Sequence, residues 1–548
     1  MILDTRLDVS PARPSLLTRW YRNPLFSAQS RNAIAFVLFL VLVILLQVAS
    51  GAYHAEFAGY PDEPAHYVTS LMVRQYIVHP SLPPIDFARD YYYHYPKVAF
   101  GHWPPVLYIV QALWMLLFSP SRTSVFAELA LTTAFLAYAV YLEVRRSFGW
   151  NAGLLAGFLT ICIPLVQTYT DEEMADTLLT LLCFWSAVYL GRYIESERWQ
   201  DSAWFGVFFA LAVLTKGNGW LLALIPPVAL LLTRRLRLFL RRSFWVSVLI
   251  VLALCVPWQL MTMQMADRGW AGGSQPSVSY TLDALRRFFL ILVQIPGPVL
   301  SGLIAIGIAV SVLAPMFRKA VASRPAVMAA LILAVWIFHS LVPAGVEDRK
   351  LIIAVPALVL FLFTGSFWLA DHLPLRGRLL LWRRTAVAVL AIMVFSMQTF
   401  AIPHRKHYGY TEAAEFLTSN PDLRTATIMV SSPSFGEGLL ISEVAMREPR
   451  PQAVIIRATK ALAEVDWNVT RYRSRFSTPT EVLKYLETRR ADVVVTDTFA
   501  PAGDFLHDRL LKEAIRQNLG RLQLVATFPK GASAEAGQVQ LYRIYRYR

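Results

Sequence analysis

Five charged residues stand at the ends of long apolar runs in this sequence and could do chemistry there: Asp62, Glu63, Asp176, Lys216 and Arg349. Ionisable side chains next to a bilayer are costly to keep and are usually retained for function. A carboxylate in such a place can take the proton of an attacking hydroxyl or amine. Fixed cations can hold a phosphate and stabilise the charge that builds on it as it leaves. The set therefore predicts group transfer from a phosphate-linked donor, with the three acids as catalytic candidates and the two cations as phosphate-binding candidates.

Each of these residues also has a purely structural interpretation. Asp62 and Glu63 could lie in a solvated loop or begin a helix, because acids favour a helix N-terminus. Asp176 could cap the apolar helix that follows it. Lys216 could be a turn residue that snorkels to the interface, and Arg349 could pair with one of the two acids that precede it.

Other polar residues give weaker signals. The acidic run at 171–173 is interpreted as surface. A divalent cation near Asp62, Glu63 and Asp176 is compatible with the sequence, but the chemistry does not require any cofactor. The three cysteines lie in apolar segments and provide neither a disulfide framework nor a metal spacing. Half of the histidines lie in the segment after the first apolar run, with a spacing that fits no zinc site: His54, His66, His79, His94 and His102.

The composition is that of a polytopic membrane protein. Of the 548 residues, 56% are hydrophobic and only 16% are charged, against about 25% charged in soluble domains, and the mean hydropathy is +0.45. Most of the net charge of +15 comes from short loops between apolar runs. This is the positive-inside pattern of membrane proteins, so the basic balance does not indicate a nucleic-acid partner.

Apolar runs of spanning length predict about eleven membrane spans. The first run is longer than a signal-peptide core of roughly 7–15 residues, so it is expected to remain as a span after a cytoplasmic segment, 1–32. The runs lie near 33–51, 125–143, 151–168, 175–193, 202–215, 218–233, 244–263, 298–316, 325–343, 350–370 and 385–402.

Charge decides the role of one more apolar segment, 104–119. If this segment does not cross, every basic cluster of the later loops falls on the side of the N-terminal arginines, as the positive-inside rule requires. We therefore expect 104–119 to lie against the outer interface, within an external loop at 52–123. The clusters are Arg145 and Arg146; Arg192 and Arg198; Arg234, Arg235, Arg237, Arg241 and Arg242; Arg318, Lys319 and Arg324; and Arg376, Arg378, Arg383 and Arg384.

Residues 403–548 are predicted to form an external α/β domain that follows a membrane domain at 33–402. Runs rich in β-branched residues alternate there with segments of helical composition, which is typical of a small and at least partly parallel sheet. The expected strands are 425–430, 452–456, 491–496 and 522–526, and the expected helices are 411–418, 479–490 and 504–517.

Several stretches carry a family resemblance. They are Asp62-Glu63-Pro-Ala-His-Tyr, Trp103-Pro-Pro-Val-Leu-Tyr108, Phe148-Gly149 with Ala152-Gly-Leu-Leu-Ala156, Met174-Ala-Asp176-Thr-Leu-Leu179, and Leu214-Thr-Lys216-Gly217 with Arg349-Lys-Leu-Ile-Ile-Ala-Val-Pro356. In this order they resemble the GT-C superfamily of polyprenyl-phosphate-sugar-dependent glycosyltransferases, and most closely its protein O-mannosyltransferases and lipid A aminoarabinose transferases. The likeness covers about residues 30–370. Many members carry Lys or His directly before the two prolines, where this chain has Trp103 and His102 is one position away.

The resemblance implies a GT-C-like fold and an inverting glycosyltransferase with Asp62 as general base. Its donor would be a polyprenyl-phosphate-linked sugar, and its acceptor a lipid, glycan or protein outside the cytoplasm. Lys216, Arg349 and His102 would contact the donor phosphate, and the other two acids would orient the acceptor or tune the base. The likeness further implies membrane lipids as surroundings and a bacterial inner membrane, with the site on its outer face.

Two other function classes stay open. A transporter or lipid flippase would place charges and broken helices near the midplane, whereas here the acids gather at one membrane surface. A non-catalytic envelope-assembly protein would use its spans only to anchor the C-terminal domain. That domain expressed alone discriminates between these classes, because full activity without the membrane part would exclude the glycosyltransferase.

Overall fold

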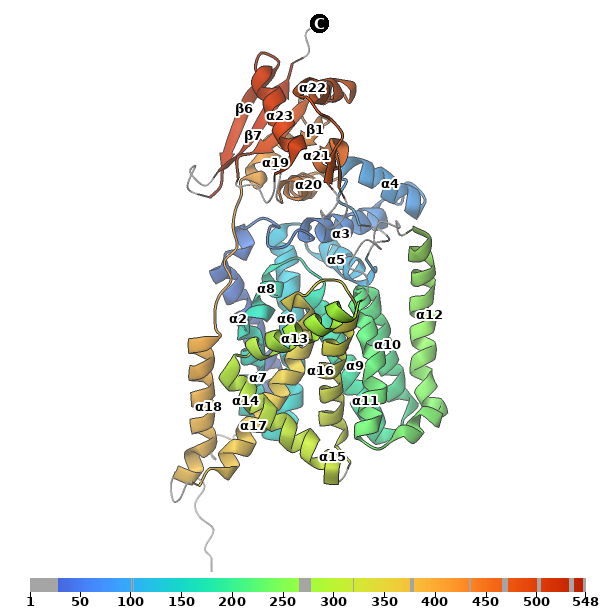
Figure 1. The fold of residues 1–548 in the computed structure, drawn as a ribbon, viewed down its shortest axis with the longest axis vertical. Helices are drawn as coiled ribbons and strands as arrows, with labels where there is room; N and C mark the ends of the chain where they lie inside the picture. The colour runs from blue at the N-terminus through green and yellow to red at the C-terminus, as the bar shows by residue number, and fades with distance from the viewer. Residues whose placement is uncertain are drawn as a thin grey trace, which may run out of the picture.

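The computed structural model shows a bundle of long helices with a small sheet domain at one end and three helices of the first loop between them (Figure 1). His102 lies outside the residues that the structure describes. These are 28–99, 101, 103–265, 277–318, 320–374, 379–432, 435–465, 472–499, 504–531 and 537–545.

Each of the eleven apolar runs forms a helix or a series of consecutive helices, as expected where lipid cannot satisfy backbone polar groups. By length and composition, seven of the described helices can cross a membrane, or eight if a bent pair counts as one. The number eleven stays a prediction. The bundle elements are α2 (Ala28–Ser50), α6 (Arg122–Phe148), α7 (Trp150–Cys162), α8 (Pro164–Asp171), α9 (Asp176–Ser196), α10 (Trp199–Thr215), η2 (Gly217–Leu224), α11 (Ile225–Leu232), η3 (Leu236–Leu240), α12 (Arg242–Met265), α14 (Pro298–Ile308), η5 (Ala309–Leu313), α15 (Ala314–Arg318), α16 (Ser323–Leu341), η6 (Asp348–Ala354), α17 (Val355–His372) and α18 (Leu379–Gln398).

Prolines interrupt three of the spans near the end that faces the sheet domain. Because proline cannot donate the helical N–H bond, the chain leaves regular α-geometry before it. Pro164 separates α7 from α8, whose axes differ by 62°. Pro226 and Pro356 begin α11 and α17, and each follows a 3-10 segment, η2 or η6. Lys216 and Arg349 lie at two of these breaks.

The loops that carry the basic clusters lie together at the opposite end of the bundle (Figure 1). Arg235 donates to the carbonyl oxygen of Ile194 at 2.6 Å, and Arg234 donates to that of Met316 at 3.2 Å. The described members of these clusters thus share one surface, which is the arrangement that the positive-inside rule requires. Which side of a membrane this surface faces stays a prediction.

The first loop folds into helices that rest on the bundle. Helix α5 has 12 residues, a length of about 18 Å, so it is too short to cross a hydrocarbon core of about 30 Å. It packs against α3 and buries Tyr108 and Gln111. The helix of segment 104–119 is therefore too short to span by itself, and its place against the outer interface stays a prediction. The loop elements are η1 (Ala52–His54), α3 (Glu63–Val78), α4 (Pro84–His94) and α5 (Val106–Leu117); α13 (Val278–Gln294) precedes α14.

The C-terminal segment is an α/β domain, as predicted. Its sheet has the order β2-β1-β5-β7-β6; β2, β1 and β5 are parallel, and β7 runs antiparallel to both β5 and β6. All four expected strands and all three expected helices are present; α20, α21, β3, β4 and β7 were not expected. The elements are α19 (Tyr410–Ser419), β1 (Thr427–Val430), α20 (Gly436–Arg447), β2 (Val454–Arg457), α21 (Ala458–Ala461), β3 (Ala463–Val465), β4 (Tyr472–Ser474), α22 (Pro479–Thr488), β5 (Val493–Asp497), α23 (Leu506–Gln517), β6 (Leu522–Pro529) and β7 (Gln538–Ile544).

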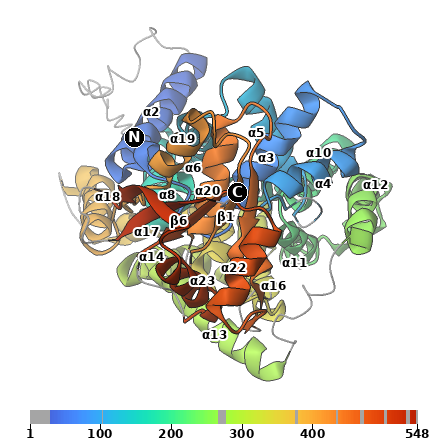
Figure 2. The ribbon, with the colours of Figure 1, turned by 90° about the horizontal axis from the view of Figure 1, so that it is seen from above.

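The sheet has a helix layer on each face, and one of these layers is shared with the first loop. Successive strand residues point to opposite faces, so Met429 packs with α22 and α23 while Ile428 and Val430 pack with α19 and α20. The second core also contains Tyr67 and Tyr91 of the first loop. Seen from above, the domain covers the helices beneath it (Figure 2). It is therefore bound to the membrane domain by common apolar packing, not only by a linker.

A buried ion pair fixes the linker between α18 and α19 to the first loop. Arg405 is bidentate to Glu63, with distances of 3.0 and 3.1 Å, and both side chains are nearly inaccessible, at 6% and 0% exposure. Arg405 also bonds the carbonyl oxygens of Ser50 and Glu56 through its backbone and side chain, each at 2.8 Å. The linker thus closes over the start of α3.

Two glycines allow α14 and α17 to cross at backbone contact. A Cβ on Gly365 would lie 1.9 Å from the carbonyl oxygen of Leu303, and one on Gly307 would lie 2.1 Å from that of Phe361. Small residues at such crossings are a common device in membrane helix packing.

The close crossing predicts that alanine destabilises the protein at Gly365 but not at Gly302. Gly365→Ala is expected to destabilise the protein by about 1–3 kcal/mol, because the added methyl overpacks the contact. Gly302→Ala on the same helix pair is the control: nothing lies within 4 Å of its Cβ position, so no loss is expected. The measurement is the melting temperature in detergent, and equal melting temperatures for both variants would contradict the close crossing.

The buried pair predicts a rescue. Arg405→Met leaves the Glu63 carboxylate buried and unpaired, which costs about 3–5 kcal/mol, and the double variant Glu63→Gln/Arg405→Met should recover more than half of the lost melting temperature. Arg287→Met, which breaks an exposed pair with Asp283 at 3.5 Å, serves as the matched control and should change it little. If the double variant melts at no higher temperature than Arg405→Met, the pair does not hold the linker.

Candidate active site

Asp62 lies at the N-terminus of α3, at the junction between the helix bundle and the C-terminal domain. Pro64, in the first turn, favours a helix start here, and the Asp62 carbonyl oxygen accepts the backbone N–H of Ala65 at 2.9 Å. The Asp62 side chain keeps 20% exposure. Burial raises the pKa of its carboxyl above the ordinary value, and the charges of Arg349, Lys97 and Lys216 oppose that rise. One partly accessible carboxylate therefore faces three cations.

Arg349 is held beside Asp62 by its neighbours in η6. Its Nε lies 2.5 Å from Glu347 Oε2, and its Nη1 lies 3.9 Å from Asp62 Oδ2. The guanidinium also stacks over the ring of Tyr60, 4.1 Å from the centroid. Arg349 thus pairs with a neighbouring acid, as the structural interpretation expected, and faces Asp62 as well.

Lys216 is fixed by the second predicted acid. Its Nζ donates to both carboxylate oxygens of Asp176, at 2.8 and 2.9 Å, across the start of α9 and the end of α10. Asp176 is buried, and Lys216 keeps 19% exposure. Asp176 therefore orients the lysine. The next basic residue, Lys350, donates to the carbonyl oxygens of Ala344 and Gly345, both at 2.6 Å.

Glu63 points away from this cluster. Besides the two bonds from Arg405, its carboxylate accepts the backbone N–H groups of Gly59 at 2.5 Å, Tyr60 at 2.9 Å and Glu173 at 2.8 Å. These contacts order the turn that precedes Asp62. Glu63 therefore positions Asp62 through the backbone of this turn.

The interpretation of residues 171–173 as surface was wrong. Asp171, Glu172 and Glu173 are 3%, 8% and 0% exposed. Glu173 bonds the side chain of Gln111, and burial together with the charge of Glu63 raises the pKa of Glu172 to about 8. The run is buried because partners from distant segments cover it.

Lys97 is a site residue that the sequence did not single out. It follows α4 and is half-buried; burial and the charge of Arg457 lower its pKa to about 7, while Asp62 raises it. The C-terminal domain closes over it: a Cβ on Gly438 would lie 3.2 Å from Lys97 Cε and 3.1 Å from Pro64 Cγ. The one available signal was that Lys97 is the sole lysine of loop 52–123.

The predicted metal candidates do not gather as a ligand set among the described residues. Glu63 and Asp176 are each already neutralised by a cation. Among the described residues, the atoms that could bind a metal and lie within 4.8 Å of one another belong to Glu56, His407 and Glu412. This group lies on the linker side of the site, where both Glu56 oxygens already accept backbone N–H groups.

The position before the two prolines is filled by an aromatic pair. The Trp103 ring stacks on the His66 ring with 4.3 Å between centroids, and His66 Nδ1 lies 3.1 Å from the Tyr108 hydroxyl. A stack of this kind shapes one wall of the site; it does not add a fixed charge.

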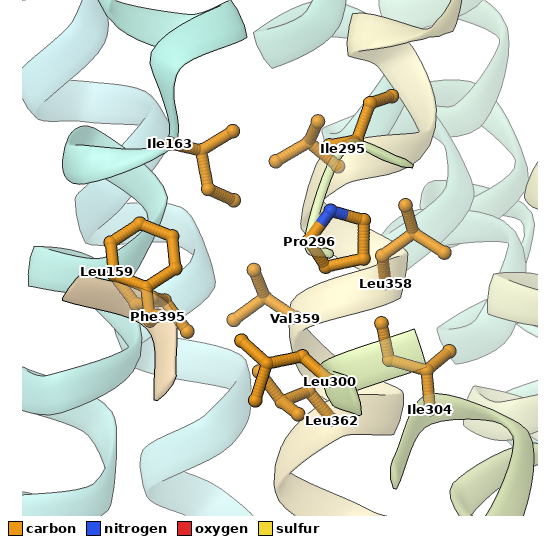
Figure 3. A pocket seen from close by; sticks show the side chains of 11 residues that line it. Leu159, Ile163, Ile295, Pro296, Leu300, Ile304, Leu358, Val359, Leu362 and Phe395 are labelled. Carbon is orange, nitrogen blue, oxygen red and sulfur yellow. The ribbon is translucent and has the colours of Figure 1, made fainter. Parts of the chain in front are cut away.

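An apolar cavity lies within the bundle, on the far side of the break between α7 and α8. Figure 3 shows Leu159 and Ile163 on one wall, facing Ile295, Pro296 and Leu300 on the other. Every side chain that lines the cavity is apolar. The volume of the cavity is about 10 Å³, so it is a small apolar packing void and not a ligand site.

Comparison with known proteins agrees with this architecture. Residues 102–260 match the family model of dolichyl-phosphate-mannose-protein mannosyltransferases. None of the curated proteins matches the sequence. The structure is similar to that of ArnT from Cupriavidus metallidurans bound to undecaprenyl phosphate, with a TM-score of 0.57 and 14% identity over 92% of this chain and 97% of that chain.

An archaeal enzyme shares the fold as well. The oligosaccharyltransferase AglB from Archaeoglobus fulgidus, in complex with an inhibitory peptide and a dolichol-phosphate, gives a TM-score of 0.53 at 11% identity, over 88% of this chain and 70% of that chain. Its complex with Zn and sulfate gives 0.51 at 15% identity, over 84% and 68%. The chain therefore has the fold of these two glycosyltransferases, and residues 102–260 resemble the mannosyltransferase family.

Proposed function

We propose that the protein is an inverting glycosyltransferase that moves a sugar from a polyprenyl-phosphate donor to an acceptor outside the cytoplasm. One observation carries the proposal: the partly exposed Asp62 carboxylate faces Arg349, Lys97 and Lys216 at the surface of the helix bundle. A base next to a cluster of cations is what sugar transfer from a phosphate requires. The undecaprenyl phosphate bound to ArnT, which has the same fold, supports the choice of donor.

The reaction is a single displacement. Asp62 takes the proton of the acceptor hydroxyl or amine, and the acceptor atom attacks the anomeric carbon from the side opposite to the phosphate. The bond between that carbon and the phosphate oxygen breaks, and its electron pair leaves with polyprenyl phosphate. Because this leaving group is already a stable anion, no second acid has to protonate it, in contrast to most glycosidases.

The remaining candidates take supporting roles. Arg349 and Lys216 hold the donor phosphate and stabilise its growing charge. Asp176 orients Lys216, and Glu63 orders the turn that carries Asp62. The cations that surround the base supply this stabilisation without a metal, although the Zn-bound AglB structure keeps a divalent cation compatible with the fold. His102 stays a phosphate-binding prediction.

The donor's tail would stay in the hydrocarbon beside the helix bundle while its phosphate reaches the cations. The apolar cavity of Figure 3, at about 10 Å³, is too small to take the tail. The acceptor, a lipid, glycan or protein, would approach from the C-terminal domain, on the outer face of a bacterial inner membrane.

Replacement of the base tests the function. Cells with Asp62→Asn should accumulate one glycosylated polyprenyl phosphate, because its transfer slows by at least about 10²-fold without the base. Mass spectrometry of the lipid extract measures it and identifies the sugar. Asp283→Asn, an exposed acid of α13, is the control and should leave the lipids unchanged. Equal lipid profiles for wild type and Asp62→Asn at equal expression would refute the transferase.

The position of Lys97 predicts in which direction the pH dependence of kcat/KM shifts when its charge is removed. Its positive charge favours the ionised form of Asp62, so Lys97→Met should raise the Asp62 pKa and move the acid limb of the kcat/KM profile about one pH unit higher. Because the pKa of Lys97 is lowered to about 7, the difference from wild type should be largest below pH 7 and fade above it. Lys97→Arg keeps the charge and should restore the acid limb; identical profiles for Lys97→Met and wild type would contradict the electrostatic role.

A further inference from the structure

A second cavity lies outside the membrane bundle. It is a cleft of about 890 Å³ between α4 and the C-terminal domain. Helix α4 lines one wall, and the edge strand β2 with the end of α22 lines the other. The size is in the range of sites that hold several sugar units or a drug-sized molecule.

The lining of the cleft is basic and aromatic. None of the described residues that line it is acidic. Tyr92 and Tyr93 of α4 are 48% and 65% exposed, and the ring of Tyr485 stands opposite. The cations are Arg89, Arg457, Lys460, Arg489 and Arg490.

Few of these cations are neutralised by strong partners. Arg89 pairs with Asp86 at 3.2 Å, but both side chains are more than half exposed, and such surface pairs contribute about 0–1 kcal/mol. Arg489 stacks over Tyr485, 5.4 Å from the ring centroid. Arg457 bonds Glu437 at 2.9 Å, and Lys460 donates to the Val465 carbonyl oxygen at 3.0 Å, which leaves its charge without neutralisation by that bond. The cleft therefore presents a net positive face.

Arg490 occupies a position that local structure would give to glycine. Its φ is +53°, directly after α22. The backbone N–H of Arg490 bonds Glu487 and that of Ala491 bonds Leu486, both at 3.0 Å, which is the Schellman pattern that favours glycine in the left-handed conformation. An arginine there costs roughly 1 kcal/mol, and it extends the basic lining of the cleft.

The cleft borders the segment that carries Lys97. Pro96 and Val98, on either side of Lys97, are part of its lining, and Arg457 donates to the Pro96 carbonyl oxygen at 3.4 Å. Lys97 Cε and Pro64 Cγ, in the first turn of α3, both approach the Cβ position of Gly438, at 3.2 and 3.1 Å. A molecule bound along the cleft would thus lie next to the segment that reaches the start of α3, where Asp62 stands.

We propose that this cleft binds an anionic saccharide, a sugar chain with phosphate or carboxylate groups, as part of the acceptor. The guanidinium groups take the anionic groups through paired hydrogen bonds, and the tyrosine rings cover the apolar faces of the sugars while their hydroxyls stay in water. The proposal extends the proposed function and rests on it, because the saccharide is an acceptor only if the protein transfers a sugar. The bound saccharide can be soluble or the head group of a glycolipid.

Binding to the full-length protein tests this directly. The protein, in nanodiscs of phosphatidylcholine, is titrated with fluorescent pentamannosyl phosphate and with neutral mannopentaose. The phosphorylated probe should bind at least tenfold more tightly, and its affinity should fall with salt. Equal affinities for the two probes would overturn the proposal, as would tighter binding of an uncharged extended peptide, which would identify the free edge of β2 as a peptide site.

Arg490→Gly separates binding from folding. This variant relieves the strained backbone, so its melting temperature should rise or stay constant while affinity for the phosphorylated probe falls at least fivefold. Arg516→Ala removes an equally exposed arginine from α23, paired with Glu513 at 3.6 Å, and should bind as wild type. Unchanged affinity in Arg490→Gly, or an equal loss in Arg516→Ala, would refute a specific site.

Two further measurements identify the source of the saccharide and separate its binding from catalysis. The same phosphorylated saccharide attached to a dialkyl lipid in the nanodisc should bind more tightly than the soluble probe if a glycolipid is the acceptor, and equally if the acceptor is soluble. Binding is also measured in Asp62→Asn. If Asp62→Asn binds the phosphorylated saccharide but no longer transfers sugar, both proposals are supported. If Asp62→Asn binds it and still transfers sugar, only the role of Asp62 as base is refuted. If the protein no longer prefers the phosphorylated probe over the neutral one, only the cleft proposal is refuted.

Discussion

The buried ion pair between Glu63 and Arg405 is the contact on which the arrangement at the membrane surface depends. Removing two charges from water costs several kcal/mol each, and only a close partner with further hydrogen bonds offsets that cost. Glu63 has both, and its bonds reach the turn before α3, the segment before α9 and the linker to the C-terminal domain. Three chain segments are therefore fixed relative to one another directly behind Asp62.

The charges at this surface follow a common rule. A span is broken near its end by proline, the break carries a cation, and an acid holds the cation in place: Asp176 holds Lys216, and Glu347 holds Arg349. Asp62 differs, because Arg349 approaches it only to 3.9 Å and its carboxylate stays partly exposed. This carboxylate lies where a proton would have to go, next to cations that other acids hold in place.

The sequence predicted features that depend on local composition. The spans were recognisable because hydrocarbon admits little but apolar helix, and Asp62, Lys216 and Arg349 could be brought together because span ends share a surface. Partners far along the chain were not predictable: Arg405 carries no local signal, although it lies 3.9 Å from Glu172, one of the acids that were assigned to the surface. Strand β7 was missed because its run, Gln-Val-Gln-Leu-Tyr-Arg-Ile, is half polar although it lies between β5 and β6.

The separation of the paired residues also bears on how the protein is made. Glu63 and Arg405 are 342 residues apart, and the bundle helices from α6 to α18 lie between them in the sequence. During synthesis the carboxylate side of the pair is therefore completed first and has to wait, exposed to water, until every span has been inserted. Only then can the linker arrive, bury the acid and let α20 close over Lys97. The order of translation itself thus means that the arrangement around Asp62 is completed only after the linker has been made.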